Sequence, residues 1–217
     1  MRFVDRTEAG QALAELLTGL RPENVVVLAL PRGGLPVAAP VARALDAPLD
    51  VILVRKVGLP FQPELAMAAV GEGGVFVPNE YVLRSLVVDP SLVAAAAAEQ
   101  QEVIRARAEL LRAIRPAEPL TGRIALIVDD GLATGSTALA AVRVARAHGA
   151  DRVIVAAPVA PRDGLDELRA EADEVVVAYT PHPFDAIGRF YEDFTQVSDA
   201  EVVRILGSFS TGGDQAD

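Results

Sequence analysis

The chain has 217 residues, of which 51% are hydrophobic and 23% charged, as expected for a globular α/β protein with a substantial core. The formal net charge of −10 argues against nucleic acid as the main partner, because binding to a phosphate backbone requires a basic surface. The chain contains no cysteine and only two histidines, which excludes disulfides and thiol nucleophiles and disfavours a Cys- or His-rich metal site. No apolar run approaches the roughly 18 residues of a membrane span, and the N-terminus lacks an apolar signal core, so we expect a cytoplasmic protein that does not enter the membrane.

Apolar periodicity divides the chain into alternating helices and strands. The predicted helices cover residues 6–20, a segment carrying Val37, Val41 and Leu45, and residues 91–114, 134–148 and 199–206. The predicted strands cover residues 25–30, 49–54, 65–70, 74–77, 124–128, 153–157 and 174–179. Residues 58–63 contain two prolines and are predicted to form a loop, and Pro40 limits where the second helix can begin. This alternation predicts one α/β domain over residues 1–217, with a doubly wound parallel sheet in a core of about 25–180 and a flexible tail at 208–217.

The most informative segment is residues 124–137, with the sequence IALIVDDGLATGST. Its apolar run is typical of a buried parallel strand and ends at Asp129 and Asp130, so the two carboxylates lie at the sheet edge where α/β proteins bind ligands. The loop that follows supplies small residues and hydroxyls: Gly131, Ala133, Thr134, Gly135, Ser136 and Thr137. The start of the next helix favours a phosphate, whereas paired carboxylates suit vicinal hydroxyls or the coordination shell of Mg²⁺. The alternative is an ordinary strand–turn–helix with a capping hydroxyl.

This segment resembles the signature of the type I phosphoribosyltransferases, which bind phosphoribosyl pyrophosphate (PRPP). The resemblance implies that Asp129 and Asp130 hold the ribose hydroxyls and act in catalysis, and that the loop over residues 131–137 holds the 5′-phosphate. It also implies Mg²⁺ as cofactor, with Asp129 and Asp130 as candidate ligands directly or through water, and a homodimer. In this family a small hood over the site comes from the segments that flank the core, here residues 1–24 and 181–207.

A second loop, Pro-Arg-Gly-Gly, follows the first predicted strand. The resemblance implies that Arg32, Gly33 and Gly34 bind pyrophosphate and that an unusual cis peptide lies near the basic residue; read alone, the motif is a turn. Arg55 and Lys56 end the second predicted strand and could stabilise the departing pyrophosphate, or they could be a solvated basic pair. Glu64 is a candidate acid or base, with an exposed surface glutamate as the alternative.

The acceptor side is less defined. Aromatic residues gather after the last predicted strand, and among them Phe190 and Tyr191 could stack on a planar acceptor or simply anchor the C-terminal segment. Ala133 stands where enzymes of the family that act on 6-oxopurines usually have an aspartate, which counts against guanine and hypoxanthine as acceptors. The motifs around Arg55, Glu64 and Phe190 look like those of a bacterial branch of the family with no firmly assigned acceptor.

Together these features predict a Mg²⁺-dependent phosphoribosyltransferase of nucleotide metabolism. It would transfer the phosphoribosyl group of PRPP to a planar, nitrogenous small-molecule acceptor and release pyrophosphate. A regulatory protein that senses PRPP or a nucleotide without turnover is the alternative. A PRPP synthase is a weaker hypothesis, because the sequence contains no recognisable ATP site.

Overall fold

The computed structural model describes residues 2–60 and 62–209, apart from the side chain of residue 64. The strands are β1 (Val25–Ala29), β2 (Leu49–Val51), β3 (Val54–Leu59), β4 (Gln62–Gly71), β5 (Val75–Pro78), β6 (Ile124–Val128), β7 (Arg152–Val159) and β8 (Glu174–Tyr179). The α-helices are α1 (Arg6–Leu17), α2 (Gly34–Leu45), α3 (Glu80–Ser85), α4 (Pro90–Arg112), α5 (Ser136–Ala147), α6 (Asp166–Glu171) and α7 (Asp199–Gly207). Short 3-10 turns are η1 (Thr18–Leu20), η2 (Glu72–Gly74) and η3 (Ile187–Phe190). The predicted tail falls mostly on residues 210–217, outside the described part of the chain.

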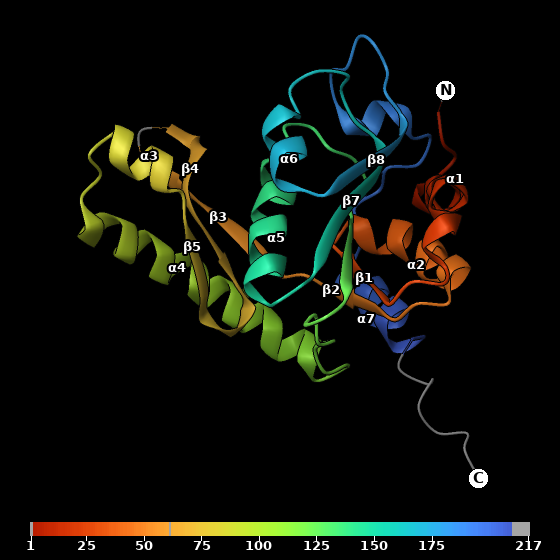
Figure 1. Ribbon diagram of the computed structural model, residues 1–217. Helices are drawn as coiled ribbons and strands as arrows, with labels where there is room; N and C mark the ends of the chain where they lie inside the picture. The colour runs from red at the N-terminus through yellow and green to blue at the C-terminus, as the bar shows by residue number, and fades with distance from the viewer. Residues whose placement is uncertain (1, 61, 210–217) are drawn as a thin grey trace.

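The core is a parallel sheet with strand order β2-β1-β6-β7-β8 and helices on both faces (Figure 1). Alternate residues of the same strand enter different helical layers: Val25 and Val27 pack with α1 and α2, whereas Val26 and Leu28 pack with α5. Because β1 and β6 are buried on both faces, their sequences are continuous apolar runs rather than alternating ones. The predicted doubly wound α/β fold is therefore confirmed.

The strand order reverses between β1 and β6, because the chain passes from β1 outward to β2 and later returns to the other side of β1. The two strands pair in register from Val25 with Ile124 to Ala29 with Val128. The backbone amide of Leu30 donates to the Val128 carbonyl over 2.9 Å, which holds the two following loops together. In open α/β sheets such a reversal creates the crevice in which ligands bind, so the topology alone brings the two predicted loops to one place.

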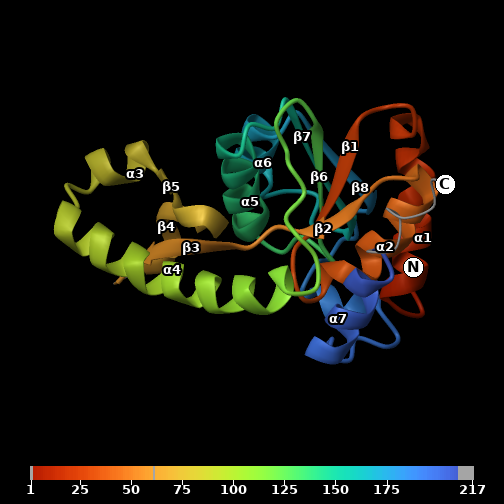
Figure 2. The same cartoon turned by 90° about the horizontal axis from the view of Figure 1, so that it is seen from below.

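Residues 54–112 form an arm that extends from the β2 edge of the core (Figures 1 and 2). Its β3, β4 and β5 make a separate antiparallel sheet, with α4 along it and α3 at its outer end. The predicted strand over 49–54 is wrong, since β2 ends at Val51 and β3 begins at Val54. The predicted loop over 58–63 includes residue 61, which lies outside the described residues, but its two ends are wrong. They belong to β3 and β4, Leu59 pairs with Gln62, and register shifts around Gly58 accompany this pairing.

Three helix predictions also need correction. Pro40 does not mark the start of α2 but lies inside it, and the buried face of the helix offsets a cost of about 3 kcal/mol for an interior proline. The helices α3 and α6 were not predicted, because six residues are too few to show a helical period. The helix α5 begins at Ser136, so Thr134 belongs to the loop before it.

The two segments that flank the core meet beside the sheet. Phe3 forms an isolated parallel bridge with Tyr191, in which its amide donates to the Phe190 carbonyl and its carbonyl accepts from the Glu192 amide, both over 2.8 Å. The C-terminal helix α7 packs on α2. Across the described residues, the helices are all too short or too polar to cross a membrane.

Candidate active site

The acidic pair lies in the turn that follows β6. Asp130 donates its amide to the Asp129 Oδ1 atom over 2.9 Å, and both residues are half-buried. Burial raises the pKa of both carboxyl groups, and for Asp129 the neighbouring Asp130 charge raises it further. Two carboxylates at one strand end therefore carry an electrostatic cost that a cation would relieve.

Asp130 has a partner that the sequence did not reveal. The Arg6 Nε atom donates to Asp130 Oδ2 over 2.9 Å, and the two side chains are only 11% and 14% exposed. The Arg6 guanidinium lies 3.9 Å from the centre of the Phe194 ring and donates to the Thr195 carbonyl over 2.9 Å. Arg6 thus joins the start of α1, the acidic turn and the C-terminal segment. It is 124 positions from Asp130 in a region without a motif, so no sequence signal could have identified it.

The predicted phosphate loop surrounds a small cavity. This cavity has a volume of about 160 Å³ and is lined by residues 129–138 together with Ile187 of η3. Thr134 and Ser136 place their hydroxyl oxygens 3.0 Å apart at the start of α5. Gly135 adopts a φ of 70°, a left-handed conformation that glycine takes without strain, and this turns the chain into the helix. Hydroxyls, a helix N-terminus and a concave loop are the features that bind a phosphate monoester.

The second loop lies directly against the acidic turn. The peptide bond between Pro31 and Arg32 is cis, as the resemblance implied. A Cβ atom placed on Gly33 would overlap the carboxylate of Asp130, and one on Gly34 would overlap the Val128 carbonyl. Only glycine permits this contact, so the two predicted loops form one continuous surface.

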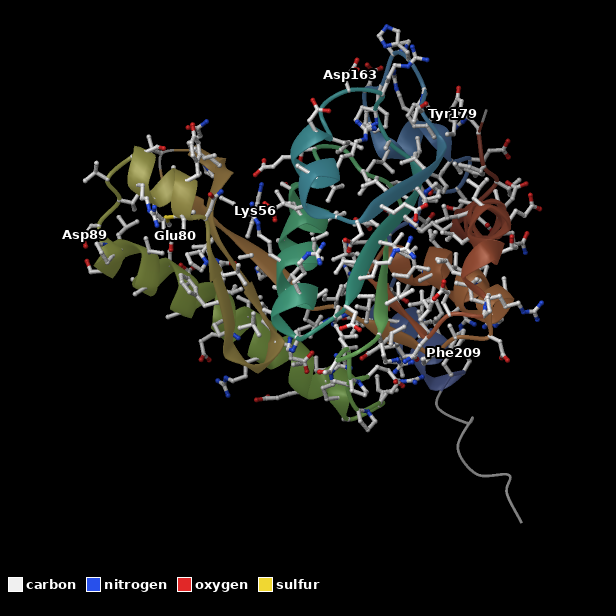
Figure 3. All side chains as sticks on the ribbon, in the orientation of Figure 1. Lys56, Glu80, Asp89, Asp163, Tyr179 and Phe209 are labelled. Atoms are coloured by element: carbon white, nitrogen blue, oxygen red, sulfur yellow. The ribbon has the colours of Figure 1, made fainter. Side chains whose placement is uncertain are left out.

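Arg55 and Lys56 do not end a strand of the core but lie on β3 of the arm. Neighbouring strand residues point to opposite faces, and the structure separates the two side chains accordingly. Arg55 donates to Gln100 of α4 over 2.6 Å and lines a cavity that also contains Arg32 and Thr137. Lys56 lies on the side of the arm that faces α5 (Figure 3). Glu64 belongs to β4 rather than to a loop, and its side chain is outside what the structure describes.

The cavity beside Arg32 has a volume of about 290 Å³. Two of its charged residues were not singled out in the sequence, Arg107 of α4 and Asp199 of α7. They come from elements far apart in the chain, so only the folded structure could place them beside the second loop.

The two aromatic candidates occupy different environments. Phe190 is half-buried and stacks on Phe184, with ring centres 5.5 Å apart. Tyr191 is 1% exposed, and its hydroxyl donates to the Asp130 carbonyl over 2.6 Å. Burial leaves the Tyr191 ring no free face for an acceptor, so its contacts are those of a support for the acidic turn. The apolar side chain that reaches the phosphate-loop cavity from this segment is Ile187.

Comparison with known proteins agrees with this geometry. The sequence pattern of the phosphoribosyl transferase domain matches residues 5–184, which include the acidic pair and both loops. The chain belongs to this family. The crystal structure of TT1426 from Thermus thermophilus is 48% identical to this phosphoribosyltransferase domain, with a TM-score of 0.91 over 96% of this chain and 99% of that one.

Two curated relatives come from strains of Mycobacterium tuberculosis. These proteins, MT0597 and Rv0571c, are provisionally named phosphoribosyl transferases and are each 53% identical to this chain over 204 residues. The match covers 94% of this chain and 46% of each relative, so the phosphoribosyltransferase domain spans about half the length of the curated relatives it matches.

The donor atoms at the acidic pair suit Mg²⁺. This ion usually binds proteins through one or two carboxylates and keeps several waters or phosphate oxygens. Asp129 and Asp130 offer carboxylate oxygens. Burial raises the pKa of both carboxyl groups, and the nearby Arg6 charge does not cancel this rise, so a bound cation would stabilise the ionised pair. Asp130 shares one oxygen with Arg6, which leaves Asp129 and the second Asp130 oxygen as the better candidates.

Proposed function

We propose that this domain binds PRPP and transfers its phosphoribosyl group to a planar nitrogenous acceptor with release of pyrophosphate. The contact between Gly33 and the Asp130 carboxylate carries this proposal. It makes the acidic turn, the phosphate loop and the Arg32 loop three parts of one surface. PRPP offers a diol, a 5′-monophosphate and a pyrophosphate, one group for each part.

Each part has a distinct task in the proposed reaction. Asp129 and Asp130 hold the ribose hydroxyls, the loop from Gly131 to Thr137 holds the 5′-phosphate, and Arg32 with Gly33 and Gly34 holds pyrophosphate. Mg²⁺, when bound near the carboxylates, supplies positive charge to the pyrophosphate oxygens. The bond between C1 and the pyrophosphate oxygen breaks with its electron pair leaving on pyrophosphate, while the acceptor nitrogen bonds to C1 and releases a proton. Positioning and charge stabilisation account for most of the rate.

For the acceptor we propose a site next to Ile187, because this side chain lines the cavity over the phosphate loop. Phe190 stacks on Phe184, and both rings pack against the same small core cluster as Ile187. Phe190→Ala should therefore impair acceptor use more than PRPP binding. Ala133 offers no carboxylate to a purine ring. Guanine and hypoxanthine should therefore be poor acceptors, and efficient turnover of guanine would contradict this assignment.

The experiment is an assay of pyrophosphate release from PRPP and Mg²⁺ with a panel of planar nitrogenous acceptors and a fractionated metabolite extract. We expect release with at least one acceptor, and loss of that release in the Asp129→Asn, Asp130→Asn double variant. Binding of PRPP with no release across the panel and extract would instead support the sensor hypothesis. Release that persists in the double variant would place the ribose site elsewhere.

A further inference from the structure

One carboxylate oxygen lies between two guanidinium groups in the 290 Å³ cavity beside the second loop. The Asp199 Oδ1 atom accepts from Arg107 Nη2 over 2.6 Å and lies 3.7 Å from Arg32 Nη1. Arg32 comes from the loop after β1, Arg107 from the C-terminal half of α4 and Asp199 from the first turn of α7. The core, the arm and the C-terminal helix therefore meet at this one oxygen atom.

The position of this oxygen matters because Arg32 is the proposed pyrophosphate ligand. Two guanidinium groups that both pair with one carboxylate oxygen are also placed to bind a phosphate group, because arginine donates bidentate hydrogen bonds to phosphate oxygens. Arg55 adds a third cation to the same cavity, whose lining also includes the apolar residues Leu30 and Ile104.

The Asp199 carboxylate is a weak occupant of this site. Its side chain is 64% exposed, and exposed ion pairs contribute about 0–1 kcal/mol. Pyrophosphate carries several negative charges and can contact both arginines at once. It should therefore displace Asp199, although the carboxylate must first give up its two cations.

We propose that Arg107 is a second pyrophosphate-binding arginine beside Arg32, and that Asp199 is an internal counter-ion which pyrophosphate must displace. Through this contact the C-terminal helix weakens binding of the pyrophosphate group and restrains the arm against the core. The inference rests on the proposed function, because it takes the Arg32 loop as the pyrophosphate subsite. It goes further in naming a residue of the arm and a competing residue of α7.

The first test measures Arg107 by calorimetric titration with magnesium pyrophosphate and, separately, with ribose 5-phosphate. Arg107→Gln should weaken pyrophosphate binding about tenfold, the loss that one charge-assisted hydrogen bond produces, and leave ribose 5-phosphate binding within about twofold. The matched control is Arg105→Gln on the same helix, because Arg105 pairs with Glu102 and Glu109 away from the cavity. Unchanged pyrophosphate binding, or equal weakening of both ligands, would overturn the assignment of Arg107.

The second test measures Asp199. Asp199→Asn should tighten pyrophosphate binding by about threefold to fivefold, because the competing charge is removed and an exposed ion pair contributes at most about 1 kcal/mol. Its control is Glu201→Gln, which also removes one negative charge from the first turns of α7. Glu201 pairs with Arg204 rather than with the cavity arginines, so this change should leave pyrophosphate binding unaltered. In the Arg107→Gln background the gain from Asp199→Asn should shrink to less than twofold. Unchanged or weaker pyrophosphate binding in Asp199→Asn would overturn the counter-ion role and leave Asp199 as an anchor for α7.

These outcomes can be separated from failure of the proposed function. Pyrophosphate binding needs neither an acceptor nor turnover, so a protein that senses PRPP would still show the Arg107 and Asp199 effects. If PRPP binding depends on Asp129 and Asp130 while Arg107→Gln and Asp199→Asn change nothing, the proposed function stands and this inference fails.

Discussion

The site contains two anion-binding regions of different construction. The loop from Gly131 to Thr137 carries no charged side chain and offers backbone amides, hydroxyls and the N-terminus of α5. The cavity beside Arg32 offers guanidinium groups, and one acidic side chain, Asp199, already pairs with two of them. The first region is fixed by backbone geometry. The second depends on side chains from three elements.

This difference determines how each region should respond to change. Backbone dipoles are already oriented in the folded state, so a side-chain substitution in the first region removes little unless it moves the backbone. Charged side chains in the second region compete among themselves and are screened by salt. Substitutions that shift the contact between the regions should therefore have the largest effects, and changes to a single cation should have smaller ones.

The largest effect is expected for Gly33→Ala. The new methyl group would overlap the Asp130 carboxylate, which Arg6 holds in place, so the acidic turn must shift relative to the Arg32 loop. We expect PRPP turnover to fall on the order of 100-fold, the usual cost of misplacing reacting groups by about 1 Å. The control is Gly19→Ala, since a Cβ atom on Gly19 would meet nothing within 4 Å. Steady-state kinetics of both variants give the answer, and wild-type turnover in Gly33→Ala would contradict the close contact.

A smaller and more selective effect is expected for Arg32→Ala. Removing one guanidinium should weaken pyrophosphate binding about tenfold, because charge-assisted hydrogen bonds contribute roughly 1.5–3 kcal/mol. Ribose 5-phosphate uses the other region and should bind almost as well as before. Calorimetry with both ligands separates these outcomes. Equal weakening of the two ligands would assign Arg32 a structural role instead.

The smallest effect concerns stability without ligand. Burial and the Asp130 charge raise the pKa of Asp129, so the folded state binds that proton more tightly than the unfolded state does. The free energy of unfolding should then fall as the pH rises from the ordinary aspartate pKa to the raised one. Above the raised pKa the full cost of burying the ionised Asp129 carboxylate is present. Asp129→Asn should raise the melting temperature at pH 7 by a few degrees and lose this advantage at acidic pH. The control is Asp163→Asn, because Asp163 is exposed. A lower melting temperature in Asp129→Asn would contradict the claim that the ionised Asp129 carboxylate destabilises the fold.

The same comparison shows how far sequence could predict the site. Asp129, Asp130 and the loop after them are contiguous, and the order of strand, loop and helix fixes their relative positions, so a linear motif contains the information. Arg32 could be added through the family resemblance of the loop after the first predicted strand, and the pairing of β1 with β6 then places that loop beside the acidic turn. Arg6, Arg107 and Asp199 carry no motif and meet the site through packing of α1, the arm and α7. The arm itself was misjudged because prolines in residues 58–63 indicated a loop, whereas a register shift keeps the hairpin paired.

The central claim is that Asp129 and Asp130 hold the ribose of PRPP beside an independent pyrophosphate region. Calorimetric titration of the wild type and of the Asp129→Asn, Asp130→Asn double variant with PRPP and Mg²⁺ tests it most directly, with pyrophosphate as the second ligand. We predict that the double variant loses about 100-fold in PRPP affinity, since two hydrogen-bonded carboxylates contribute roughly 1.5 kcal/mol or more each. Pyrophosphate binding should be retained within severalfold. PRPP affinity that is equal in the two proteins would contradict the account.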